Sequence, residues 1–326
     1  MKPQPTNQPE QIINLWPHRL AWALACAAIA MIWVGGLVTT YRAGMSVPDW
    51  PTTYGYWFYP LPRWLTAFWD LFLEHGHRTL GQVVGILAIA TTLAVWRWDR
   101  RRWMRGLALA ALALVCIQGT LGGLRVIEDS LFFAKVHACH APLCFALCGA
   151  LVTLTSPAWQ RREKPQRHTA ARWLKRLAWF LTVALYLEII LGAQLRHQPP
   201  DPDPGWFRLW VWLKLIGAGL MALAMVWLLL IVWRRASDQP KIARRAELLA
   251  GLFLVQVILG AATWVTNFGW PAWFTDYLWV IQYTVVARGR LQVNVTTAHA
   301  AVASLTLAAS LSLILWSQRL LQPLRR

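Results

Sequence analysis

Long uncharged apolar runs constrain this chain more than any other feature. A membrane-spanning helix needs roughly 17–25 apolar residues, and seven runs of that kind carry no charged residue. They lie at 20–41, 79–96, 106–124, 136–160, 215–233, 248–275 and 291–318. An eighth run, 177–195, is interrupted only by Glu188. Because a bilayer offers no water to exposed backbone groups, the sequence predicts an all-α membrane protein with eight transmembrane helices.

The chain is strongly basic, with a net charge of +18, a balance that could indicate nucleic acid as a partner. The placement of the charge argues against this. Most basic residues fall on one side of an eight-span protein, in the leader, at 97–105, 161–176 and 234–245, and near the C-terminus. The positive-inside rule makes that side cytoplasmic. We therefore expect an integral multi-pass protein of a bacterial-type plasma membrane, with both termini cytoplasmic, membrane lipid as a partner and no nucleic acid.

A short motif recurs near the outer ends of three predicted helices. It consists of Gln or Glu, two further residues, Leu, Gly, and then Gly or Ala, at 118–123, 188–193 and 256–261. Tight packing accounts for the small residues but not for the polar one. Because internal repeats in membrane proteins mark sites within or between the repeats, we expect two pseudo-symmetric four-helix bundles. The predicted parts are a cytoplasmic leader (1–19), an N-terminal bundle (20–155), a cytoplasmic linker (156–176), a C-terminal bundle (177–317) and a cytoplasmic tail (318–326).

Two further expectations concern processing and redox chemistry. No cleavable signal peptide is expected, because the first apolar run follows a polar leader and is long enough to span. No structural disulfide is expected either, because all cysteines fall inside predicted spans, where they serve as small apolar side chains. They are Cys26, Cys116, Cys139, Cys144 and Cys148.

The first outer loop, 42–71, is rich in proline and aromatic residues. Proline stiffens such a loop, and Trp and Tyr are enriched where a membrane meets water. Two interpretations stay open. The loop is either an interfacial aromatic belt or a lid over a ligand at the outer surface.

Three histidines lie at a similar depth in three predicted helices. His77, His137 and His299 each stand a few residues in from the outer end of their helix. Two imidazoles that face each other across a bundle are a standard grip on a haem iron. We therefore predict that His77 and His137 ligate one haem iron and that His299 ligates another. Zinc fits less well, because it needs three or four converging ligands.

The C-terminal bundle offers no histidine on its second helix, about 208–233, to pair with His299. The candidate there is Lys214, and three interpretations compete. Lys214 ligates iron as a neutral amine, it snorkels to the surface or contacts a propionate, or His299 holds the haem alone. His197, just outside the preceding helix, is a possible substitute. Contributions from His75 and His140 are left open.

Charged residues beside the histidines suggest further roles. Glu74 stands one turn from His77 on the same helix face, where a carboxylate can relay protons or stabilise a developing cation. An ion pair with Arg78 at i+4 is the alternative, and the two can coexist. Arg78, Arg125 and Arg196 lie near the outer rim. Guanidinium groups there can hold haem propionates or bind lipid phosphate.

At several points the sequence resembles the haem A synthase family. Glu74-x-x-His77-Arg78 is similar to the family's signature on the second helix, and the segment 44–51 is similar to its first outer loop. Further similar motifs are Gln118 to Arg125, His137, Leu191 to Arg196, and Thr296 to His299. The resemblance covers about 30–310, nearly the whole chain.

The resemblance implies a haem-dependent membrane oxidoreductase with eight spans in two bundles. It implies successive oxidations of a methyl group of haem O to the formyl group of haem A, for cytochrome oxidase maturation. His77, His137 and Glu74 would surround haem O, and the C-terminal bundle would hold haem b through His299. Candidate partners are haem O, the enzyme that makes it, an electron donor and a second copy of the chain.

The chain departs from the family pattern in two places. Lys214 stands where the family usually has histidine, which bears on the ligation of the second haem. The first outer loop also lacks the paired cysteines of some members, so a thiol-based step there is not supported.

Two other functions compete with this expectation. A dihaem b-type cytochrome that only exchanges electrons with quinone would share the histidines, but it would not need Glu74. A transporter with inverted repeats is disfavoured, because two halves of four spans each are parallel rather than inverted.

Overall fold

The computed structural model describes residues 14–57, 60–161, 163–271 and 284–324. Within these residues eight helices are long and apolar enough to cross a membrane. They are α1 (Trp16–Tyr41), α3 (Trp69–Trp98), α4 (Arg102–Ile127), α5 (Leu131–Thr155), α7 (Ala171–Arg196), α8 (Pro204–Arg235), α9 (Pro240–Phe268) and α11 (Arg290–Leu320). The short elements are α2 (Leu61–Leu65), α6 (Pro157–Gln160), β1 (Gln166–Arg167) and β2 (Leu321–Gln322). The predicted all-α membrane fold is confirmed for this part of the chain.

Each long helix begins slightly earlier than the sequence predicts. For example, α9 starts at Pro240, whereas its apolar run begins at residue 248. Proline suits the first turn of a helix, where its missing N–H is not needed. At α8, Pro204 has the same place, and the Asp203 side chain caps the helix by accepting a hydrogen bond from Trp206 N at 2.9 Å. Caps and prolines therefore extend the helices beyond the apolar runs.

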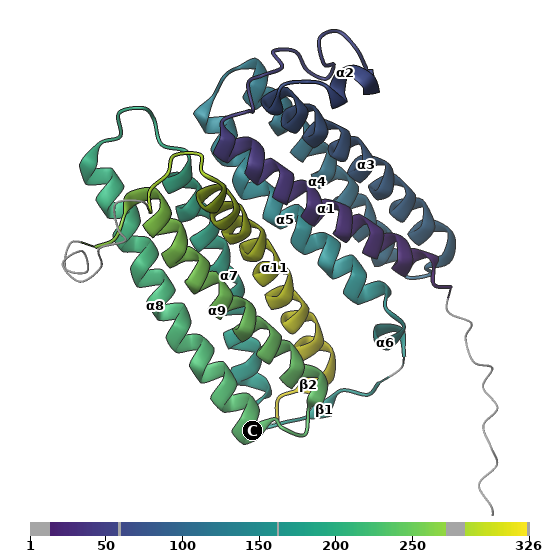
Figure 1. Cartoon of the computed structure of the whole chain (residues 1–326). Helices are drawn as coiled ribbons and strands as arrows, with labels where there is room; N and C mark the ends of the chain where they lie inside the picture. Colours follow the sequence, from purple (N-terminus) through teal and green to yellow (C-terminus); the bar gives the residue numbers. More distant parts are fainter. Residues whose placement is uncertain (1–13, 58–59, 162, 272–283, 325–326) are drawn as a thin grey trace, which may run out of the picture.

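The long helices form two closed rings of four (Figure 1). In the first ring α1 contacts α3, α3 contacts α4, α4 contacts α5, and α5 returns to α1. In the second ring α7, α8, α9 and α11 follow the same order. As a result α3 lies diagonally across from α5, and α8 lies diagonally across from α11. Side chains on diagonal helices can meet in the core of such a bundle.

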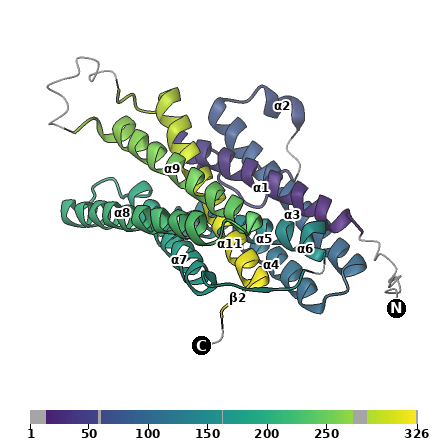
Figure 2. The same cartoon turned by 90° about the horizontal axis from the view of Figure 1, so that it is seen from below.

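The two rings pack side by side through α1 and α5 on one side and α7 and α11 on the other (Figures 1 and 2). Small side chains let these helices approach closely, as where Gly149 of α5 meets Ala308 of α11. Arg196 of α7 crosses the interface, and its Nη2 donates to Gly36 O at 2.9 Å and to Thr40 Oγ1 at 2.8 Å. A charged hydrogen-bonded contact thus joins the two rings.

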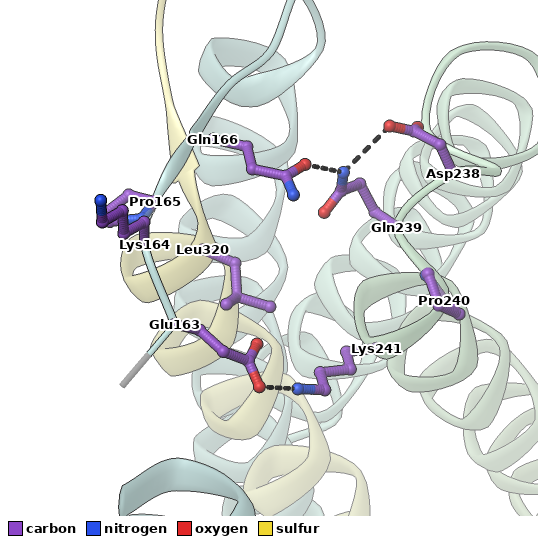
Figure 3. A pocket seen from close by; sticks show the side chains of 9 residues that line it. All are labelled: Glu163, Lys164, Pro165, Gln166, Asp238, Gln239, Pro240, Lys241 and Leu320. Atoms are coloured by element: carbon purple, nitrogen blue, oxygen red, sulfur yellow. Dashed lines mark hydrogen bonds and ion pairs between the residues drawn. The ribbon is translucent and has the colours of Figure 1, made fainter. Parts of the chain in front are cut away.

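The linker and the C-terminal segment meet at one end of the molecule. β1 and β2 pair in parallel, with Gln166 opposite Leu321. A pocket beside this pair is drawn in Figure 3, where Gln239 Nε2 donates to Gln166 Oε1 at 2.7 Å and Lys241 forms an ion pair with Glu163. No histidine is among the described residues that line this pocket. We interpret it as the joint between the linker, the α8–α9 turn and the C-terminal segment.

Several predicted features fall partly outside the described residues. These are the leader at 1–13, the first outer loop at 58–59, the linker at 162, the apolar run 248–275 at 272–275, and the tail at 325–326. All five cysteines are described and free, which confirms the prediction that they form no disulfide. The pseudo-symmetry of the bundles and their boundaries stay predictions.

Candidate functional site

Four nitrogen-bearing side chains lie against glycines of a neighbouring helix. His77 of α3 faces Gly35 of α1, and a Cβ on that glycine would lie 2.8 Å from His77 Cε1. The equivalent distances are 3.1 Å for His137 Cε1 and Gly122, 3.2 Å for His299 Cε1 and Gly260, and 3.4 Å for Lys214 Nζ and Gly192. Glycine allows this approach because it has no Cβ. In each of these four helices, α3, α5, α8 and α11, one such side chain sits in a glycine cradle.

The cradle helices share a second feature. Four residues before each glycine, on the same helix face, stand Met31, Gln118, Glu188 and Gln256 in α1, α4, α7 and α9 respectively. The sequence motif thereby gains a structural meaning, because its glycine makes room for the facing side chain and its polar residue contacts that side chain. The copy in α1 could not be predicted from the repeated motif, because Met31 stands in place of the polar residue.

Gln118 organises the surroundings of His137. Its Nε2 lies 3.2 Å from His137 Nδ1 and 3.3 Å from His137 Nε2. Its Oε1 lies 2.8 Å from His140 Nδ1, and that nitrogen is also 3.3 Å from Cys144 Sγ. The structure therefore places His140 in a polar network behind His137.

His77 and His137 are the two imidazoles that the sequence predicts as ligands of one haem iron. They stand on diagonal helices of one ring, close enough to interact electrostatically. His77 Nδ1 is buried and has no hydrogen-bond partner among the described residues, although the Met31 backbone lies beside the ring. A metal-ligating imidazole usually directs its second nitrogen at a backbone carbonyl, carboxylate or water. The cradle and the unpaired nitrogen are both consistent with a ring that is oriented to ligate a metal.

Glu74 is almost completely buried, with 3% of its surface exposed. Its Oε1 accepts a hydrogen bond from Arg78 Nη2 at 2.7 Å, and its Oε2 accepts one from Val47 N at 3.0 Å. The ion pair expected with Arg78 is therefore present. Both oxygens of this carboxylate are held in place one helical turn from His77, so a proton bound there would have a fixed position.

Arg78 also fastens the first outer loop to α3. Its guanidinium donates to Asp49 O at 2.6 Å, to Thr52 O at 2.7 Å and to Val47 O at 3.0 Å. With the bond to Glu74, this guanidinium serves three loop carbonyls and one carboxylate. These partners could not be predicted from residue types, because every residue carries a backbone carbonyl.

The loop is also closed on itself and covers the end of the first ring (Figure 1). The Asp49 carboxylate accepts hydrogen bonds from Tyr54 N at 2.7 Å, from Gly55 N at 2.9 Å and from the Thr52 hydroxyl. Partial burial raises the pKa of Asp49, but these hydrogen bonds outweigh it and lower the pKa to about 2. The Trp50 ring rests directly on Gly123 of α4. The loop is therefore attached to α3 through Arg78 and to α4 through Trp50, and it covers this end of the first ring.

In the second ring His299 lies in a setting like that of His77. Its Nδ1 is buried without a hydrogen-bond partner among the described residues, and Gln256 Nε2 lies 3.4 Å from its Nε2. Lys214 is engaged elsewhere, because its Nζ donates to Glu188 O at 3.0 Å and to Glu188 Oε2 at 3.2 Å. The ammonium thus points at α7 rather than snorkelling to the surface. Compared with the copies in α4 and α9, this copy of the motif has Glu188 in place of Gln, and it faces Lys214 in place of His. These two replacements together are the sequence signal for the ion pair.

The three arginines that are predicted to contact propionates differ in the groups that they bind in the structure. Arg78 holds the loop, and Arg196 holds α1. Arg125 lies against Gly44, where a Cβ would be 2.7 Å from its Nη2, and it has no hydrogen-bond partner among the described residues. Arg125 therefore has the freest donors of the three.

Two further histidines considered as ligands, His75 and His197, lie apart from the cradles. His75 Nδ1 is 3.1 Å from Thr53 Oγ1, and its ring meets Trp64 edge-on. His197 follows α7 and is buried. Burial, together with the nearby Arg196, lowers the pKa of His197 to about 3, which keeps it neutral. The structure thus gives His75 a packing role under the outer loop.

Comparison with known proteins places these residues in a family. A heme A synthase from Methylobacterium sp. (strain 4-46) is 26% identical, with 76% of this chain and 83% of the relative aligned. One from Symbiobacterium thermophilum is 28% identical, with 73% and 81% aligned. The human heme A synthase COX15 is 27% identical, with 58% and 53% aligned.

The family model COX15-CtaA, described as cytochrome oxidase assembly protein, matches residues 18–199. This segment is more than half of the chain, and it contains the first ring from residue 18 of α1 onward, with His77, His137 and the first outer loop. The chain therefore belongs to the COX15-CtaA family of cytochrome oxidase assembly proteins.

Proposed function

We propose that this protein is a haem A synthase, which oxidises a methyl group of haem O to the formyl group of haem A for cytochrome oxidase maturation. The observation that carries the proposal is the pair His77 and His137 on diagonal helices of the first ring, with the buried Glu74 one turn from His77. The relatives named heme A synthase and the family match support the same reaction.

In this proposal haem O is the substrate of the first ring. His77 and His137 would hold it through their imidazoles, and their glycine cradles fix where the rings stand. Arg125 has free donors near the outer end, which suits it to pair with a propionate. The outer loop, fastened by Arg78, excludes water from this end of the site.

Glu74 is the proposed catalytic residue. Its carboxylate is held by Arg78 and by Val47 N, so it keeps one position while the substrate methyl group is oxidised. From that position it can accept a proton or stabilise a developing positive charge. Redox chemistry itself is what bound haem iron supplies.

The second ring is proposed to hold a haem b through His299. Its glycine cradle and its unpaired Nδ1 match those of His77. We further propose that both termini are cytoplasmic, because the basic clusters gather at that end. The proposed partners are the enzyme that makes haem O and an external electron donor.

The test is co-expression with a haem O source, followed by mass separation of the extracted haems. The wild-type chain is expected to produce haem A. His77→Ala and His137→Ala are each expected to abolish haem A, because each removes one axial imidazole. Retained haem A in either variant would contradict the substrate site.

A dihaem cytochrome limited to electron transfer is not favoured by the relatives. The same experiment addresses it, because such a cytochrome would leave haem O unchanged.

A further inference from the structure

The second ring differs from the first at the position opposite its histidine. In the first ring both cradled side chains are imidazoles, whereas the second ring pairs His299 with Lys214. Lys214 and His299 stand on diagonal helices and interact electrostatically. The two side chains therefore belong to helices on opposite sides of the core of the second ring.

Lys214 is built into an ion pair. Its Nζ donates to both the carboxylate and the backbone carbonyl of Glu188. The two side chains are only 26% and 12% exposed. Gly192 leaves room for the ammonium, and Gly217 leaves room for the carboxylate. Close packing on both partners holds this pair inside the ring.

An ammonium group has three donors and no lone pair to offer a metal. Ligation by Lys214 would require loss of its proton and would leave the Glu188 carboxylate buried without a partner. Removing one member of a buried ion pair is destabilising, because the other charge is left uncompensated. The effect is smaller here because both groups are partly exposed. The geometry therefore disfavours Lys214 as an axial ligand, while His299 remains suited to the role.

We propose that the second ring binds its haem through His299 alone, which leaves the coordination position on the Lys214 side open to a small diatomic ligand such as carbon monoxide. This inference rests on the proposed function only in that the second ring holds a haem. The first ring, with two imidazoles, offers no such open position.

The test uses the full-length protein, purified with its haem. Absorption and electron paramagnetic resonance spectra report the spin state, and carbon monoxide added to the reduced protein reports open coordination. The wild type is expected to contain a high-spin haem that binds carbon monoxide. His299→Ala is expected to lose that fraction.

A matched pair of variants identifies the role of Lys214. Glu188→Gln with Lys214→His recreates the Gln–His pair of the other helices without an unpaired charge. This variant is expected to convert the high-spin haem to a low-spin form that no longer binds carbon monoxide. Glu188→Gln with Lys214→Met is the neutral control, and it is expected to stay high-spin and reactive.

Three outcomes would overturn the proposal. One is a wild type with only low-spin haem that does not bind carbon monoxide. Another is a neutral control that alone becomes high-spin, since this would make Lys214 a ligand. The third is a reactive fraction that survives in His299→Ala.

Haem A formation, measured by mass on the same membranes, separates this inference from the proposed function. Haem A formed by a protein without a reactive haem would refute only the ligation. A reactive haem lost in His299→Ala, in a protein that forms no haem A, would refute only the synthase activity.

Discussion

At the residue scale, each candidate ligand is positioned by a glycine on another helix. The four cradles hold His77, His137, Lys214 and His299, which lie on α3, α5, α8 and α11. A methyl group added at a cradle would press directly on an imidazole or an ammonium. The glycines therefore determine the ligand geometry although they bind nothing themselves.

Gly35→Ala tests this directly, because its Cβ would lie 2.8 Å from His77 Cε1. Overpacking of this kind costs about 1–3 kcal/mol, and we expect the ring of His77 to be displaced. The expected result is loss of the low-spin haem fraction and of haem A. Gly85→Ala on α3 is the control, because no atom lies within 4 Å of its built Cβ. Equal haem content in the two variants would refute the cradle.

Glu74→Gln is the second test at this scale. Glutamine keeps the size of the side chain, but its amide is neutral and does not act as a proton acceptor. We expect haem to remain bound and oxidation of haem O to fall by about 10²–10⁴-fold. Haem content and haem A yield are measured on the same preparation. An unchanged yield would assign Glu74 a structural role only.

At the element scale, the first outer loop behaves as one unit. Arg78 binds three of its carbonyls, and Asp49 binds three donors within it. Charged hydrogen bonds thus stabilise the loop together with the backbone bridge between Thr53 and Tyr56. Its stability should depend on the charge of Asp49.

The pKa of Asp49 is lowered from 3.8 to about 2, so its contribution is fully present above about pH 4. It should be lost as the pH falls towards 2, because protonation removes the acceptor charge. Pepsin, which is active in this range, should cut the loop at 46–57 faster as the pH falls. Asp49→Asn should be cut readily throughout. Identical pH profiles for the two proteins would contradict the assignment.

At the scale of the whole molecule, two rings share an interface through α1, α5, α7 and α11. Arg196 is the charged contact across it, with bonds to Gly36 O and Thr40 Oγ1. Because both acceptors lie on α1, the end of α7 is fixed relative to the first ring. This contact is one of those that set the relative placement of the two rings.

Arg196→Met should weaken the contact between the rings. Hydrogen bonds from a charged group contribute roughly 1.5–3 kcal/mol, so a clear fall in the apparent melting temperature in detergent is expected. Arg208→Met is the control, because Arg208 Nε bonds only Pro204 O of its own helix, among the described residues. A melting temperature equal to that of the control would show that Arg196 does not join the rings.

Much of the fold and of the site could be predicted from the sequence. The eight spans follow from run length, and the depth of His77, His137 and His299 follows from their distance to the helix ends. The Glu74–Arg78 pair follows from i,i+4 spacing. The partners of Arg78 could not be predicted, because they are loop carbonyls. The partner of Lys214 could not be predicted either, because Glu188 lies on a different helix.

The sequence by itself determined what is local: which segments are long and apolar enough to cross a membrane, and which residues share a helix face. Run length and helical periodicity suffice for these features, since each depends on neighbours along the chain. Only the tertiary structure decided which helix faces which, and with it the glycine cradles and the Lys214–Glu188 pair. Those contacts depend on the rotation and neighbours of every helix, which the packing of the whole bundle sets.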